Sequence, residues 1–342
     1  MDSDALSVSL VSRRRFLKQT VAFSAVAAIG NQVGFADVPT TTPGANEILM
    51  IGDWGYEDTA AQAKVATGMA AYIRKNSIRP DALFLLGDNW YGALDGGVKS
   101  SRWHAGFETM YPADIFDCPA YAVLGNHDYQ RWPDSKVEAE LAYARASKTR
   151  WTLPSRWYTF EFPKQNPLIT FIALDSNMPH AKPLAPGSRD FTLTREEKDQ
   201  QLIWLQEELK SPRSTPYLAV LAHHPVYSNG PHGDHPTLIQ DWDPLFRKNN
   251  VTLYLAGHDH DLQHLEFEGH PTSFFLSGGG GADLYDLKID PGKRGPYGQK
   301  LYGFSHLSVT PKELTLRHFD STGGLLHAFT KTPAGQVALL SS

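Results

Sequence analysis

The chain has 342 residues, of which 41% are hydrophobic and 20% charged, a composition typical of a folded globular protein rather than a disordered one. Its formal net charge of -5 supplies no cationic field, which argues against a nucleic-acid partner. The single cysteine, Cys118, excludes an intrachain disulfide and a cysteine-based zinc knuckle. Any metal in this protein must therefore be held by histidines and carboxylates.

The N-terminal segment predicts export. Its basic run, Ser12-Arg13-Arg14-Arg15-Phe16-Leu17-Lys18, precedes a short apolar stretch, Thr20 to Ile29, and small residues up to Ala36. This order is that of a signal peptide, and the run resembles a bacterial twin-arginine signal. The apolar stretch is too short to span a membrane. We therefore expect a twin-arginine signal peptide at 1–36, a linker at 37–45, no membrane anchor, and a mature protein that is periplasmic or secreted.

After the linker, continuous apolar runs alternate with amphipathic segments. Such runs are typical of strands buried on both faces, and they lie at Glu47–Ile51, Ala82–Leu86, Tyr121–Leu124, Ile169–Leu174, Tyr217–Leu221 and Val251–Leu255. Helices are expected at Thr59–Lys75, Ser100–Tyr111, Val137–Lys148, Thr194–Lys210 (with a Thr194/Glu197 capping box) and Pro236–Asn249. Past Gly281 the residues alternate around Gly323-Gly324, which predicts an antiparallel meander. The whole pattern predicts an α/β fold.

Polar residues follow the predicted strands at the point where each strand ends. These clusters read Gly52-Asp53-Trp54-Gly55, Gly87-Asp88-Asn89-Trp90-Tyr91, Gly125-Asn126-His127-Asp128, His223-His224-Pro225 and Gly257-His258-Asp259-His260. Any one Asp or His here is more often a turn or cap residue than a ligand. However, loops beyond the carboxyl ends of strands in open α/β sheets converge on one crevice, so five such clusters predict one site. The preceding glycines let the backbone approach a ligand closely.

The set Asp-x-Gly, Gly-Asp-x-x-Tyr, Gly-Asn-His-Asp, Val-x-x-His and Gly-His-x-His is the pattern of the metallophosphoesterases. Gly-Asp-x-x-Tyr, which contains Tyr91, resembles the purple acid phosphatases, and the spacing looks closest to the small, tartrate-resistant type. The similarity runs from about Glu47 to Phe329. It implies a four-layer metallophosphoesterase sandwich at residues 46–335, with two mixed β-sheets flanked by helices and the metals at the carboxyl ends of the strands.

The resemblance also implies a ligand set, in which iron(III) is bound by Asp53, Tyr91 and His260, a divalent ion (Fe, Zn or Mn) by Asn126, His223 and His258, and Asp88 bridges the two. Ligand chemistry agrees with this division, because phenolate and carboxylate suit a trivalent ion whereas imidazole and amide oxygen suit a divalent one. The implied reaction is attack of a metal-bound hydroxide on a phosphate monoester.

Two further histidines are candidates to protonate the leaving group or to hydrogen-bond phosphate at mildly acidic pH. His127 follows a predicted ligand directly, and His232 matches the second active-site histidine of the family. Asp128 would either orient His127 or a metal ligand, or cap its turn. His224 and His264 stand where the mammalian proteins have aromatic residues, and we expect both to be residues of the site's rim.

The sequence therefore predicts an exported, monomeric acid phosphatase that acts on small-molecule phosphate esters. Two alternatives stay open. One is a 5'-nucleotidase or phosphodiesterase of the same superfamily with two manganese or zinc ions. The other is a catalytically inert binding protein on the same fold, against which the complete set of ligand types argues.

Overall fold

The computed structural model describes residues 41–130, 136–146, 148–179 and 192–340. The predicted signal peptide and the first part of the predicted linker lie outside the described residues. Within the described part of the chain, no helix is both long enough and apolar enough to cross a membrane.

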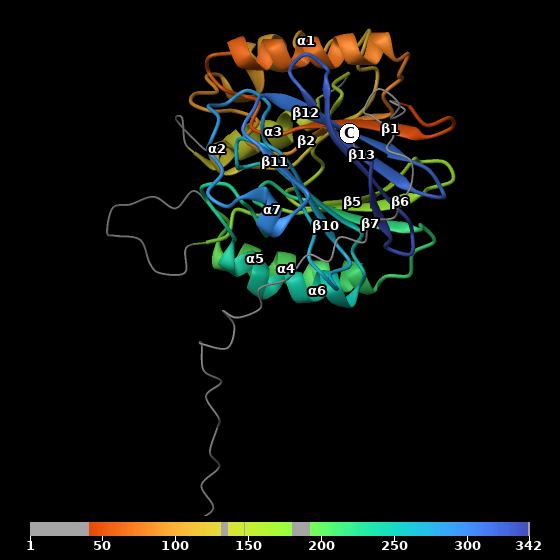
Figure 1. Ribbon diagram of the computed structural model, residues 1–342. Helices are drawn as coiled ribbons and strands as arrows, with labels where there is room; N and C mark the ends of the chain where they lie inside the picture. The colour runs from red at the N-terminus through yellow and green to blue at the C-terminus, as the bar shows by residue number, and fades with distance from the viewer. Residues whose placement is uncertain (1–40, 131–135, 147, 180–191, 341–342) are drawn as a thin grey trace, which may run out of the picture. The chain divides into compact units, whose positions relative to one another are not determined.

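Two mixed β-sheets form the centre of the fold, as predicted (Figure 1). The first sheet has eight strands in the order β15-β14-β13-β12-β1-β2-β3-β4. Strands β1 to β4 are parallel, whereas β12 to β15 form the predicted C-terminal antiparallel meander. The strands are β1 (Asn46–Ile51), β2 (Ala82–Leu85), β3 (Ala120–Ala122), β4 (Trp151–Thr152), β12 (Gly303–Val309), β13 (Leu314–Asp320), β14 (Leu325–Lys331) and β15 (Val337–Leu339).

The second sheet has seven strands in the order β11-β9-β10-β8-β7-β6-β5, with β6, β7, β8 and β10 parallel. Its strands are β5 (Tyr158–Phe162), β6 (Ile169–Ala173), β7 (Tyr217–Leu221), β8 (Leu253–Ala256), β9 (Leu262–Leu265), β10 (Ser273–Ser277) and β11 (Tyr297–Gln299). The two sheets pack through large apolar side chains. Phe84 of β2 meets Phe171 of β6 edge to face, with ring centroids 4.9 Å apart.

Helices cover the outer face of each sheet (Figure 1). Tyr72 of α1 (Ala60–Lys75) packs on Phe319 of β13, with centroids 4.3 Å apart. On the other side, Leu205 and Leu209 of α4 (Arg195–Lys210) belong to one buried cluster with Val220 of β7. The remaining helical segments are η2 (Gly97–Lys99), η3 (Trp103–Glu108), α2 (Asn126–Tyr129), α3 (Lys136–Ala144), α5 (Pro236–Asp241), α6 (Asp243–Lys248) and α7 (Pro291–Arg294). Helices, two sheets and helices make the predicted four layers.

Three predicted helices differ in the structure. The expected helix Val137–Lys148 is observed as α3, which ends at Ala144. The expected helix Pro236–Asn249 is broken at Trp242 into α5 and α6, because Pro244 in the first turn of α6 has no N–H to continue the ladder. The expected helix Ser100–Tyr111 contains the π-helical segment η3, in which the Thr109 amide donates to His104. The carbonyl of Gly106 in η3 accepts a hydrogen bond from Nε2 of Gln62 at 2.8 Å. Helix α4 begins as predicted, with the reciprocal Thr194/Glu197 capping box.

Candidate metal centre

The loops after β1, β2, β3, β7 and β8 bring the predicted site residues together. Three of these residues, Asp53, Asp88 and His258, have left-handed backbone angles, with φ of 58°, 50° and 72°. Such angles are uncommon outside glycine and cost roughly 1–3 kcal/mol each, so they persist only where the surrounding structure enforces them. In each case the strained residue directly follows a glycine just beyond the end of a strand, and its side chain enters the same site.

Two glycines explain how the loops approach so closely. A Cβ on Gly87 would lie 2.5 Å from Nδ1 of His223, and one on Gly125 would lie 2.2 Å from the Asp88 carboxylate. Gly87 also has a φ of +86°, which a larger residue adopts only with strain. These glycines therefore let the loops pack closely against one another, and their approach to a ligand stays a prediction.

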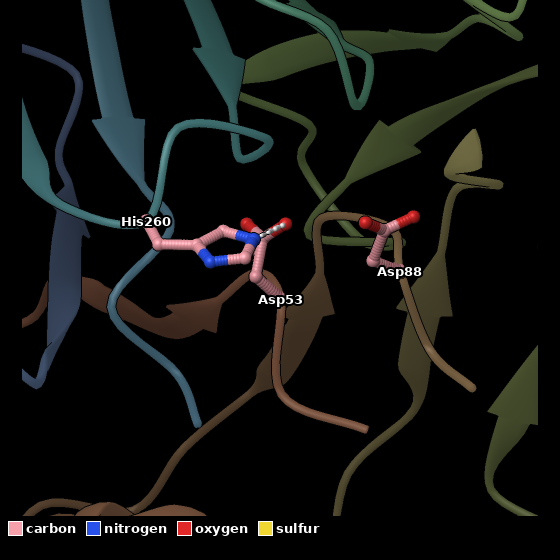
Figure 2. A group of neighbouring side chains, drawn as sticks. All are labelled: Asp53, Asp88 and His260. Atoms are coloured by element: carbon pink, nitrogen blue, oxygen red, sulfur yellow. Dashed lines mark ion pairs between the residues drawn. The ribbon is translucent and has the colours of Figure 1, made fainter. Parts of the chain in front are cut away.

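The first half of the site contains Asp53, Tyr91 and His260, and all three are buried. The Tyr91 hydroxyl lies 3.2 Å from Oδ1 of Asp53 and 3.0 Å from Nε2 of His260. Nε2 of His260 is also 3.5 Å from the same Asp53 oxygen. Figure 2 shows the His260 ring pointing at the Asp53 carboxylate, with Asp88 alongside. Asp53, Asp88 and His260 offer ligand atoms that lie within 4.8 Å of one another.

The second half of the site contains Asn126, His223 and His258. Nε2 of His223 is 3.2 Å from Oδ1 of Asn126, 3.2 Å from Nδ1 of His258 and 3.3 Å from Oδ1 of Asp88. The Asp88 carboxylate therefore lies between the two halves. All seven residues predicted as ligands meet here, although they come from five separate loops.

The donor set fits a pair of cations. Nδ1 of His223 donates to the Leu86 carbonyl at 2.9 Å, and Nδ1 of His260 donates to the Asp283 carbonyl at 2.5 Å. With those protons fixed, Nε2 of each ring can present a lone pair to the site. Lone pairs of imidazole, amide and carboxylate would then face one another at about 3 Å, which is unfavourable without positive charge between them. Protons or metal ions can supply that charge.

The ionisation of the metal-free site shows the same need for positive charge. Burial opposes the charged form of His223, but the charge and hydrogen bond of Asp88, together with Asp53 and the Leu86 carbonyl, outweigh burial and raise the pKa of His223 to about 10. Burial likewise opposes charge on His260, and contact with Asp53 still raises its pKa. Burial, together with the charges of Asp88 and Asp53, raises the pKa of Tyr91 well above its usual value. Without metal, this site therefore binds protons that a cation would replace.

The two proton-donor candidates lie in different surroundings. The His127 ring lies 4.0 Å from the Tyr91 ring and its Nδ1 donates to Gln130 at 2.9 Å. Burial lowers the pKa of His127 in spite of nearby Asp88, which favours a neutral ring. The His232 side chain is 45% exposed, and its Nδ1 donates at 2.6 Å to the fully buried carboxylate of Asp259. The His232 ring reaches the site at 4.2 Å from the His258 ring.

Asp259 is a functional candidate that the sequence did not single out. Its carboxylate accepts from the His232 amide and imidazole on one oxygen and from the Ser228 hydroxyl on the other. Asp259 lies within the Gly-His-Asp-His motif, but its partner His232 lies 27 residues earlier on another loop. Such a pair becomes visible only when the two loops are placed side by side.

Other residues near the site follow the predictions in part. Asp128 caps its turn and accepts hydrogen bonds from the amides of Gly125 and Trp90, so it joins two ligand loops instead of contacting His127 through its carboxylate. His224 is partly exposed and its ring lies 4.2 Å from that of His258, as expected of a rim residue. The expectation that His264 is a rim residue is wrong. It is fully buried in β9, and its ring is stacked on the Phe329 ring with centroids 3.8 Å apart. The loop after β8 that carries His258 and His260 ends before β9 begins, so His264 does not belong to it.

The chain is similar in sequence to known acid phosphatases. Tartrate-resistant acid phosphatase type 5 of Homo sapiens is 30% identical over 311 residues, covering 84% of this chain and 91% of that protein. The enzyme of Oryctolagus cuniculus is 32% identical, covering 80% and 87%. Purple acid phosphatase 7 of Arabidopsis thaliana is 31% identical, covering 85% and 87%. The predicted resemblance is thereby confirmed, together with the predicted enzyme class, a phosphoric monoester hydrolase.

Solved structures extend the likeness to the fold. Purple acid phosphatase PPD1 from yellow lupin superposes with a TM-score of 0.63 at 18% identity, over 85% of this chain and 54% of that one. GAP50, described as the anchor in the inner membrane complex of Plasmodium, superposes with a TM-score of 0.68 at 21% identity, over 83% and 87%. The family model of the calcineurin-like phosphoesterases matches residues 47–262. A binuclear metal centre is typical of the purple acid phosphatases among these relatives. This chain belongs to the calcineurin-like phosphoesterase family.

Proposed function

We propose that this protein is an exported acid phosphatase that hydrolyses small phosphate monoesters at a binuclear metal centre. The observation that carries the proposal is the meeting of two different donor sets at the buried carboxylate of Asp88. One set contains a phenol and a carboxylate, and the other contains imidazoles and an amide. This is the division expected for one trivalent and one divalent ion.

In this proposal Asp53, Tyr91 and His260 would hold iron(III), Asn126, His223 and His258 would hold a divalent iron, zinc or manganese ion, and Asp88 would serve both. When bound, such a pair supplies Lewis acidity, which activates water and offsets the charge of the phosphoryl group. The chain's own residues do the rest. Asp88 accepts a hydrogen bond from the His127 amide at 2.8 Å, which orients the bridging carboxylate.

The chain also provides a proton donor. The Asp259 carboxylate accepts from Nδ1 of His232 and therefore holds a proton on that nitrogen, so Nε2 is the atom that can give a proton to the departing alcohol. His127 is less suited to this role, because burial lowers its pKa and so favours a neutral ring whose one proton lies on Nδ1, toward Gln130. His232 is thus the proposed general acid, and Asp259 sets its tautomer and orientation.

The metal assignment is tested by metal analysis and the visible spectrum of the purified protein. We expect iron with a second metal, and an absorption band from tyrosinate-to-iron charge transfer. Tyr91→Phe should lose this band. The same change at the partly exposed Tyr56, whose ring centroid lies 5.4 Å from that of Tyr91, should retain it. A fully loaded wild-type protein without the band would contradict iron(III) at Tyr91. Hydrolysis confined to diesters or to nucleotides would contradict the general monoesterase assignment.

Export through the twin-arginine route is supported by the order of basic, apolar and small residues in 1–36. The prediction is that exchanging Arg13 and Arg14 for lysine keeps the chain inside the cytoplasm, whereas the wild-type chain is recovered from the periplasm or medium. Cell fractionation of both forms measures this. Equal export of the two forms would exclude the twin-arginine route.

A further inference from the structure

The loop that carries Tyr91 is buried but has no regular secondary structure. Residues 89–91 lie in neither a helix nor a strand, and Trp90 and Tyr91 are almost fully buried. Their carbonyls therefore have no ladder partner, and a buried carbonyl needs a donor from elsewhere. Two cationic side chains supply these donors.

The first is Arg102, which stands just before η3. Its Nη1 donates to the carbonyls of Tyr91 at 2.6 Å and Ala93 at 2.5 Å, and its Nη2 donates to the carbonyl of Gly55 at 2.9 Å. Gly55 belongs to the loop that begins with Asp53. The guanidinium also lies 5.2 Å from the centre of the Trp90 ring. One planar fork thus joins the loop of one predicted iron ligand to the loop of another.

The second is Lys136, the first residue of α3, which is only 2% exposed. Its Nζ donates to the carbonyls of Trp90 at 2.6 Å and Gly92 at 2.8 Å. Burying an ammonium group is unfavourable unless oxygens surround it. From the other side, the Asp128 carboxylate accepts the amides of Asn89 and Trp90 at 3.1 and 2.9 Å. The Tyr91 loop is therefore held through both its carbonyls and its amides.

We propose that Arg102 and Lys136, together the carbonyl clamp, are positioning residues that place the Tyr91 phenol for metal binding. These two side chains donate hydrogen bonds to five main-chain carbonyls, which lie on two of the loops that carry predicted metal ligands. The phenol oxygen stands 3.2 Å from Asp53 and 3.0 Å from His260, and a metal ligand set tolerates displacements of only about 0.5 Å. The inference rests on the proposed role of Tyr91 as an iron ligand.

The test compares Arg102→Gln and Lys136→Met with a matched control, Arg150→Gln. Arg150 also donates to two main-chain carbonyls, those of Phe116 and Tyr111 at 2.8 and 2.7 Å. Its guanidinium likewise lies over an aromatic ring, Phe107, at 5.1 Å. Those carbonyls belong to no ligand loop. A general effect of removing a half-buried arginine would therefore appear in all variants, whereas a positioning effect would not.

Two measurements on the full chain separate positioning from stability. In metal-free protein, hydrogen exchange of the segment 89–94 should become roughly tenfold faster in Arg102→Gln, because the Tyr91 amide donates to the Gly55 carbonyl that Arg102 holds. In iron-loaded protein, the tyrosinate band should shift and iron should bind about 10- to 100-fold more weakly. Arg102→Lys should partly restore both the slow hydrogen exchange and the iron binding of the wild type, because lysine keeps the positive charge but not the planar fork of hydrogen-bond donors.

Unchanged exchange and an unchanged band in Arg102→Gln would overturn the carbonyl clamp, as would equal changes in Arg150→Gln. If Arg102→Gln does not fold, Lys136→Met gives the same comparison after losing only two carbonyl contacts. A wild-type protein that shows no tyrosinate band would defeat the iron assignment in the proposed function. The exchange comparison in metal-free protein would still decide whether the clamp orders the Tyr91 loop.

Discussion

Replacing Asp88 by asparagine should remove at least one of the two metal ions and lower kcat/KM by at least roughly 10³-fold. Asp88 lies between the two donor sets, 3.3 Å from Nε2 of His223, and asparagine keeps its shape while losing its charge and one ligand oxygen. Metal content and initial rates on a phosphate monoester measure the effect. Of the predicted ligands, Asp88 should be the most sensitive to substitution, because in the proposed function it would contact both ions.

Asp283→Asn is the matched control. This carboxylate is exposed and accepts a hydrogen bond from the Tyr56 hydroxyl at 3.3 Å, while the main-chain carbonyl of Asp283 accepts from His260. The exchange alters a charge beside the site but no proposed ligand, so metal content should stay at the wild-type level. Full metal content and activity in Asp88→Asn would refute the bridging role.

Asp88→Asn should also change how the metal-free protein responds to pH. Against the effect of burial, Asp88 with Asp53 and the Leu86 carbonyl raises the pKa of His223 from 6.5 to about 10, so the stability that these contacts contribute is fully present below pH 6.5 and is lost as the pH rises through about 10. The thermal midpoint of chelator-treated wild-type protein should therefore fall across this range. In Asp88→Asn this part of the fall should disappear, and in metal-loaded wild type the cation should replace the proton.

Replacing His232 by glutamine should lower kcat about 100-fold on alkyl phosphates and much less on esters of acidic phenols. An alkoxide leaving group needs a proton as the ester bond breaks, whereas a stable phenolate does not. Asp259→Asn should act in the same direction, because the buried Asp259 carboxylate holds the proton on Nδ1 of His232. Rates over a series of leaving groups with different pKa values measure the dependence.

His235→Asn is the control for His232. His235 lies in the same loop, but its ring nitrogen accepts the Leu238 amide at the start of α5, and asparagine preserves an acceptor at this cap. Its kinetics should stay close to wild type on every substrate. An equal loss on alkyl and phenolic esters in His232→Gln would point to substrate binding rather than proton donation.

Much of the fold was predictable because its core strands are continuous apolar runs, and the first strand, β1, lies where Glu47–Ile51 predicts it. The edges of the sheets were less predictable. Strand β4 has only two residues and β11 only three, and β5 is exposed along part of its length, so none carries a clear pattern. These strands form because a neighbour supplies hydrogen bonds, which local sequence does not encode.

The candidate site divides in the same way. The residues that would bind metal were visible in the sequence by themselves, because Asp53, Asp88 and His258 each follow a glycine at the end of an apolar run. Only the tertiary structure decided which side chains support them. The His232–Asp259 pair and the Arg102 contacts with Tyr91 and Gly55 join residues on different loops. Their hydrogen bonds depend on distances across the fold, and a linear pattern records spacing along the chain only.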